Sequence, residues 1–187
     1  LGSRGLGDVY KRQGNIYQSD GERAPNKEKP AALFAKGSVG ITDSNKAGAS
    51  LRLYRNNTTE PGNPTQTHGD SGLRDRKTVQ NDVQFWYQYA PVDNSLINVK
   101  STLYLSDITI KTNGHNKTAE WRNNRTSGVN VVNRSHTLIF PGAHQLSYGA
   151  EYYRQQQKPE GSATLYPEGN IDFTSLYFQD CLLYTSD

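Results

Sequence analysis

The sequence predicts an all-β fold, an antiparallel meander of about seven strands that forms part of a transmembrane β-barrel. Apolar and polar residues alternate with a period of two in one segment after another, and the connections between these segments alternate between short and long. The composition agrees, since 33% of the 187 residues are hydrophobic and the mean hydropathy is -0.83. No apolar run is long enough for a transmembrane helix, which excludes a helical membrane protein.

Seven segments carry the strand pattern. In the second of them, for example, Ala49, Leu51 and Leu53 alternate with Ser50 and Arg52. The expected strands span residues 31–42, 47–54, 79–90, 96–110, 127–140, 143–157 and 171–180. Short turns are expected at 43–46, 91–95 and 141–143, and long polar loops at 55–77, 111–124 and 154–170.

Two of these strands break the alternation. Ile108 and Ile110 switch parity within 96–110, which predicts a β-bulge near Ser106 and Asp107. In the last strand, 171–180, the apolar residues do not agree on one parity, so the pattern leaves its facing undecided.

The positions of the charged residues indicate which face of each strand contacts lipid and which contacts water. They fall on the polar parity of their strands, at Lys36, Arg52, Asp82, Lys100, Arg134 and Glu151. The other parity is nearly free of charge over about the ~10 residues that cross an outer membrane, as lipid contact requires. Tyr87, Tyr89, Tyr148 and Tyr152 lie near strand ends and suit interfacial girdles. A soluble β-sandwich also alternates, but the alternation of short turns and long loops favours a barrel.

Both ends of the chain look foreign to this pattern. Residues 1–13, "LGSRGLGDVYKRQ", and residues 181–187, "CLLYTSD", resemble translated cloning-adapter sequence. We therefore expect a native segment at 14–180 and expect neither end to belong to the fold. The sequence contains no Met, so we expect an internal fragment, and its lone cysteine, Cys181, lies in the adapter-like end.

Two classes of function are excluded. The net charge of +3 comes from 21 basic and 18 acidic residues without the basic block typical of nucleic-acid binders. The sequence "GDSG" at 69–72 matches the nucleophile segment of chymotrypsin-like proteases. It continues "LRDR" within a turn-rich loop, its His68 is directly adjacent, and no plausible catalytic His and Asp elements lie upstream. We expect no enzyme, no cofactor and no nucleic-acid partner.

The segments "RDRKTVQNDVQFWYQYAPVDNSLINVKSTLYLS" (74–106), "GVNVVNRS", "HQLSYGAEYYRQ" and "NIDFTSLYFQD" together resemble the barrel of TonB-dependent outer-membrane receptors, especially the haem, haemoglobin and transferrin group. The resemblance covers most of 14–180 and rests on the order and spacing of the segments. It implies a large barrel of about 22 strands closed by a plug, of which this chain supplies roughly a third of the wall.

The resemblance also implies a function in the bacterial outer membrane. We expect active uptake of an iron-bearing ligand, namely haem, a haem protein or a ferric siderophore, with energy from TonB delivered through a plug segment that this chain lacks. The "FRAP" and "NPNL" type motifs of the haem group are also missing from 14–180. A passive porin-like channel and a secreted β-sandwich adhesin remain the alternatives.

Ligand-binding candidates are residues of the expected outer loops. His68 and His115 carry imidazoles, the usual axial ligands of haem iron, and Trp121 is a large aromatic residue in a polar loop without a core to fill. His136 is expected to face the lumen, and His144 to lie at the short-turn side. No pair of histidines has the spacing of a metal site, so no metal is expected.

Overall fold

The computed structural model describes residues 11–16, 18, 27–61, 73–114, 117–139, 142–161 and 167–183. Eight strands account for almost all of them. They are β1 (Lys11–Ile16), β2 (Lys27–Thr42), β3 (Asn45–Pro61), β4 (Leu73–Tyr89), β5 (Val99–Gly114), β6 (Lys117–Ile139), β7 (Gly142–Gly161) and β8 (Gly169–Leu183). No helix in the described part of the chain is long and apolar enough to cross a membrane.

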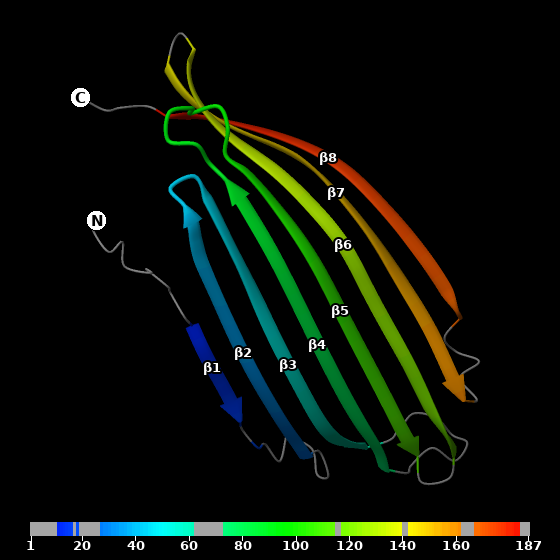
Figure 1. Ribbon diagram of the computed structural model, residues 1–187. Coiled ribbons are helices and arrows are strands. Elements are labelled where there is room, and N and C mark those ends of the chain that lie inside the picture. Colours follow the sequence, from blue (N-terminus) through cyan, green and yellow to red (C-terminus); the bar gives the residue numbers. More distant parts are fainter. Residues whose placement is uncertain are drawn as a thin grey trace.

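The strands form one antiparallel sheet in chain order, from β1 at one edge to β8 at the other. Figure 1 shows them side by side in a single curved layer, with β1 in blue and β8 in red. This is the meander that the sequence predicts, with one strand more than the seven expected. The additional strand is β1, whose only large apolar residue is Ile16, so no alternation marked it in the sequence.

Several strands are longer than predicted. The polar segment 55–77, expected as a loop, contains the end of β3 and the start of β4, and the expected loop 111–124 contains the end of β5 and the start of β6. These strand ends carry mostly polar residues on both faces, as in "RNNTTEP" and in "RNN" after Trp121. Period-two alternation requires one apolar face, and it therefore disappears where both faces meet water.

The connections still differ between the two ends of the sheet. At one end lie the two-residue turn 43–44, the link 140–141 and the nine-residue connection 90–98, which is longer than the predicted turn at 91–95. Part of this connection lies against β6, because Arg134 N donates to Asn98 O at 3.0 Å and His136 N donates to Ser95 O at 2.8 Å. The longer connections 17–26, 62–72 and 162–168 lie at the other end, together with 115–116, and we call this the loop end.

The sheet has almost no buried apolar core. Among the described residues, Val132 is the only buried hydrophobic side chain, whereas Asn56, Thr58, Asn133 and Ser135 are buried polar residues. Large apolar side chains are exposed instead, with Phe85 at 57% and Leu103 at 58% of their full accessibility. A single layer with exposed apolar residues does not have the architecture of a two-layer sandwich, so this alternative is wrong.

The strand register shows whether β5 contains the predicted bulge and which face the apolar residues of β8 occupy. Pairing continues without a shift through Ser106 and Asp107, so the predicted bulge there is wrong; the shifts lie at Gly40/Thr42 and Thr112/Gly114. Ile108 and Ile110 simply lie on the polar face beyond the apolar stretch. In β8, Leu176 pairs with Ala150 and Phe178 pairs with Tyr148, which places these two apolar residues on the apolar face.

Candidate functional site: an apolar outer face and a polar inner face

One face of the sheet is an apolar band. Alternate residues of neighbouring strands form cross-strand rows, such as Ala49, Phe85, Leu103 and Val129. We call this side the outer face, and the opposite side, which carries Arg52, Asp82 and Thr102, the inner face. A band of exposed Leu, Val, Ala and Phe without charge suits contact with hydrocarbon, because an unpaired charge there is costly.

Tyrosines border the apolar band at both ends. Tyr87 and Tyr89 of β4 and Tyr148 of β7 lie toward the short turns, whereas Tyr152 lies toward the loop end. The Tyr87 hydroxyl donates to Asn45 Oδ1, and the Tyr152 hydroxyl donates to Asp172 Oδ1 at 2.7 Å. The rings of Tyr87 and Tyr152 thus have an apolar body and a hydrogen-bonded polar tip, which is the requirement for a position at a membrane interface.

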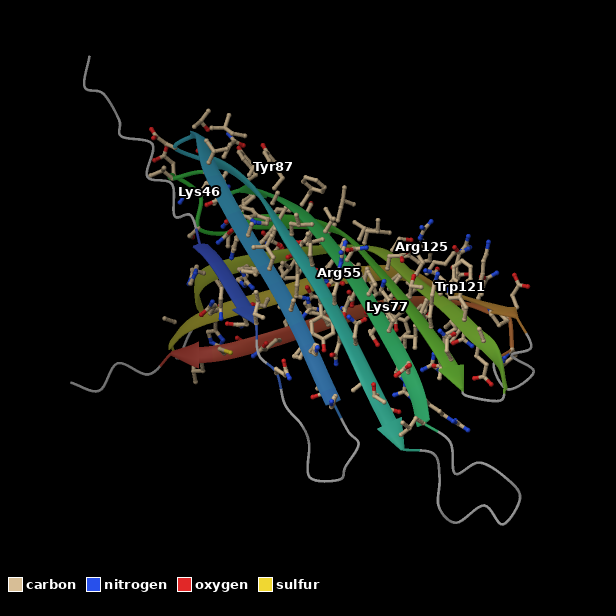
Figure 2. All side chains as sticks on the ribbon, turned by 90° about the horizontal axis from the view of Figure 1, so that it is seen from below. Lys46, Arg55, Lys77, Tyr87, Trp121 and Arg125 are labelled. Carbon is tan, nitrogen blue, oxygen red and sulfur yellow. The ribbon has the colours of Figure 1, made fainter. Side chains whose placement is uncertain are left out.

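Ion pairs follow the band at the loop end of the outer face. Arg125 Nε lies 3.0 Å from Asp107 Oδ2, and Arg154 Nε lies 2.7 Å from Asp172 Oδ1. The hydrogen bonds from Arg154 and Tyr152 lower the pKa of Asp172 below its ordinary value. Figure 2 shows Arg125 and Trp121 projecting from the same side of the sheet as Tyr87. Along β5 to β8 the outer face therefore changes from apolar to charged.

The inner face is polar along the same strands. The best-connected cluster on the inner face is centred on Asp82. Its carboxylate accepts hydrogen bonds from Arg52 Nε at 2.5 Å, Ser106 Oγ at 2.6 Å and Gln80 Nε2 at 3.0 Å. Farther along the sheet the Tyr104 hydroxyl donates to Glu151 Oε1 at 2.9 Å. Such a wall can contact water or a polar protein surface inside a barrel.

Aromatic rings on the inner face cover glycines of the neighbouring strand. Gly48 lies beneath Trp86, Gly128 beside Tyr104, and Gly149 beside Tyr177. The Lys100 ammonium group lies over the Trp86 ring, 4.7 Å from its centroid. Rings that fill the space above cross-strand glycines stabilise a curved sheet and fix its register, so these pairs shape the wall.

The structure describes only one of the three predicted ligand-binding residues. His68 and His115 lie outside the described residues. Trp121 was expected in a loop and instead lies in β6, on the outer face, where the Lys111 ammonium group is 4.4 Å from its ring centroid. Its indole Nε1 is buried without a hydrogen-bond partner. The three residues are therefore not brought together within the described structure.

The remaining histidines lie toward the short turns. His136 pairs with Gln145 on the inner face, as predicted. His144 lies on the outer face, with Nδ1 2.9 Å from Asp180 Oδ2. Among the described residues, no group of three or more His, Cys, Asp or Glu side chains is arranged to hold a metal ion.

Sequence reasoning missed a group of lysines on the outer face at the loop end, namely Lys27, Lys29, Lys77 and Lys111. Their spacing along the chain contains no motif. Only the strand register, which the sequence does not supply, shows that they share one surface.

Comparison with protein-family models gives no match. Among curated proteins, the chain is 37% identical over 171 residues to a haemin receptor of Yersinia pestis and 36% identical over 172 residues to a haemin receptor of Yersinia enterocolitica. Each alignment covers 89% of this chain and 25% of the relative. The chain thus spans about a quarter of the length of these receptors.

Among solved structures, the sheet matches the Serratia marcescens hemophore receptor HasR, which was determined in complex with its hemophore HasA and heme. The TM-score is 0.68 at 19% identity, and the match covers 91% of this chain and 25% of that receptor. This likeness shows that the fold is a segment of a receptor barrel. Together with the identity to the two haemin receptors, it confirms the resemblance of this chain to a barrel segment of TonB-dependent haem receptors.

Proposed function

We propose that the intact protein containing this segment is a receptor in the bacterial outer membrane that takes up haem, free or carried by a protein. The observation that carries the proposal is the identity of 37% to a haemin receptor along 89% of this chain. The structural match to a receptor that was solved with a hemophore and heme supports a haem protein as the source. We assign no catalytic group to this segment.

In this proposal the segment forms about a third of the barrel wall. Its outer face holds the receptor in the lipid through residues such as Leu51, Phe85 and Leu103. Its inner face offers the Asp82 cluster and the Tyr104–Glu151 pair to a plug inside the barrel. TonB would deliver the energy through that plug, and haem would pass once the plug has moved.

The ligand would arrive at the loop end, where the longer connections lie. His68 falls within the connection 62–72 and His115 within 115–116, so both remain candidates for contacting haem. Trp121 remains a candidate for contacting the protein that carries the haem, although its place on the outer face gives it a competing role at the membrane interface.

The test uses the full-length gene in a bacterial host that has lost its own haem receptor and depends on haem as its iron source. We expect growth on haemin and on haemoglobin that requires both the gene and a functional TonB. Growth that persists after deletion of TonB would instead identify a passive channel. Absence of growth on either source, with the receptor present in the outer membrane, would refute haem uptake.

A further inference from the structure

Four lysines surround a hollow on the outer face at the loop end. The hollow has a volume of about 420 Å³ and is lined by Lys27, Lys29, Asn57, Thr58, Thr59, Asp75, Arg76, Lys77, Lys111 and Asn113. All four lysine side chains are exposed. The only carboxylate in this lining is Asp75, which accepts a hydrogen bond from Thr59 Oγ1 at 2.8 Å. The lining therefore has a clear excess of positive charge.

The register brings these lysines together. Lys29 pairs with Asn57, Asn57 with Lys77, and Lys77 with Lys111, so one straight row crosses β2 to β5. Adjacent strands lie about 4.8 Å apart, and two like charges directly opposite each other destabilise a sheet. The register thus places Lys77 and Lys111 opposite each other, with the Lys111 ammonium group over the Trp121 ring, 4.4 Å from its centroid.

The described part of the chain does not neutralise this row with ion pairs. Within the described residues, no carboxylate lies within ion-pairing distance of Lys27, Lys29, Lys77 or Lys111. The neighbouring outer-face cations Arg125 and Arg154, in contrast, each have an aspartate partner. Among the described residues, the four lysines of the hollow thus have no ion-pair partner, and Asp75 is the one carboxylate in its lining.

The position of the hollow relative to the apolar band identifies its occupant. On β2, Lys29 is the first outer-face charge beyond Ala31 and Leu33, and on β3, Arg55 and then Asn57 follow Leu53. Four residues along a strand tilted by about 45° rise roughly 9 Å, which places the hollow at the depth of lipid headgroups. Lysine stems extend along apolar surface and present their ammonium groups at that level.

We propose that this hollow binds the phosphate groups of a lipid in the outer leaflet beside the barrel, with Lys29, Lys77 and Lys111 as the principal contacts. The inference rests on the proposed location in the outer membrane. The outer face points away from the lumen, so the transported ligand does not pass it, whereas a phosphate-bearing lipid of the lipid A type lies against it. A lipid held there would fix the depth of the barrel and stabilise β2 to β5.

The test compares the purified full-length receptor with its Lys29→Gln/Lys77→Gln variant. The probes are lipid A, dephosphorylated lipid A and phosphatidylcholine, and bound lipid is measured by native mass spectrometry. Because each Lys near an anionic surface contributes roughly fivefold in affinity, we expect about 25-fold weaker binding of lipid A by the double variant. Binding of the two uncharged or zwitterionic probes should not change.

The matched control is the Lys36→Gln/Lys46→Gln variant, which removes the same charge from the inner face of β2 and β3. It should bind lipid A as the unmodified receptor does. If the two double variants bind lipid A equally, whether as the unmodified receptor does or more weakly, the proposed site is wrong. It is also wrong if the loss of binding appears equally with dephosphorylated lipid A.

Haem binding, measured by absorbance on the same preparations, separates this inference from the proposed function. Lysine-dependent binding of lipid A by a receptor that does not bind haem would support the lipid site and refute the haem receptor. Haem binding without lysine-dependent lipid A binding would refute the lipid site alone.

Discussion

The indole ring of Trp86 in β4 covers the backbone of Gly48 in β3. The two residues are direct cross-strand partners, and a Cβ atom added to Gly48 would lie 2.5 Å from Cε2 of the ring. The Lys100 ammonium group lies over the same ring, 4.7 Å from its centroid. Any side chain at Gly48 must displace the indole.

We therefore expect Gly48→Ala to destabilise the barrel by about 1–3 kcal/mol, the usual effect of overpacking a filled site. Gly40→Ala is the control, because nothing lies within 4 Å of a Cβ atom built at Gly40 on the same hairpin. Urea titration of folding into lipid vesicles measures both variants. Equal stability of the two would mean that the Trp86 ring does not rest on Gly48.

The facing of the strands gives a second prediction. Leu103 lies in the apolar band between Phe85 and Val129, whereas Thr102 lies on the inner face. Leu103→Arg should lower the free energy of unfolding by about 2–4 kcal/mol because it brings a charge into the lipid near the midplane. Thr102→Arg should lower the free energy of unfolding by less than about 1 kcal/mol because the inner face is polar. Equal effects in the vesicle-folding titration would show that the faces are assigned incorrectly.

The Asp82 cluster gives a third prediction. Asp82→Asn removes the charge that accepts hydrogen bonds from Arg52, Ser106 and Gln80, and we expect a loss of about 1–2 kcal/mol. The control is Asp93→Asn, the same change at an exposed position of the connection 90–98, which should be neutral. In the Asp82→Asn background, Arg52→Gln should cost little more, and an additive loss would argue against direct coupling.

The apolar band and its facing could be predicted from the sequence, because one face meets lipid and the other is polar. Val83, Phe85 and Leu103 show this pattern directly. Where both faces are polar, as around Asn57 and Lys111, the pattern disappears, and these strand ends were predicted as loops.

The cross-strand relationships could not be predicted. Arg52 and Asp82 are 30 residues apart, and Gly48 meets Trp86 only because of the register that β3 and β4 adopt. A shift of one residue would exchange the two faces of a strand, and periodicity alone does not fix the pairing. The lysine hollow also depends on the strand register, so no sequence motif indicates it.

The chain ends give a fourth prediction. Lys11–Gln13 pair with residues 34–36 of β2, and Cys181–Leu183 pair with residues 143–145 of β7, so the expected boundaries at 13/14 and 180/181 fall inside the edge strands. We still propose that residues 1–13 and 181–187 are not native. Their removal should leave the pairing of β2 to β7 unchanged, because they touch only the two edges of the sheet. Amide hydrogen exchange checks this, and lost protection within β3 to β6 would contradict it.

Trp121 provides the last prediction because two functions compete for it. A large aromatic residue near the loop end can anchor a haem-carrying protein, and a Trp on the outer face beside Lys111 can instead lie at the membrane interface. Trp121→Ala separates the two when haemoglobin binding and vesicle insertion are measured on the same preparation. If Trp121 is an anchor, Trp121→Ala should weaken haemoglobin binding by at least about 1 kcal/mol, which raises the Kd roughly fivefold. Vesicle insertion should then remain normal.

The structure favours the interfacial role, since Trp121 is an outer-face residue of β6 in the same row as Lys77 and Lys111. We therefore expect Trp121→Ala to slow vesicle insertion and to leave haemoglobin binding unchanged. Trp121→Phe keeps an aromatic ring and should insert normally, which distinguishes a need for the ring from a need for the indole N–H. Weakened haemoglobin binding with normal insertion would instead establish the anchor and show that the ligand reaches the outer face of β6.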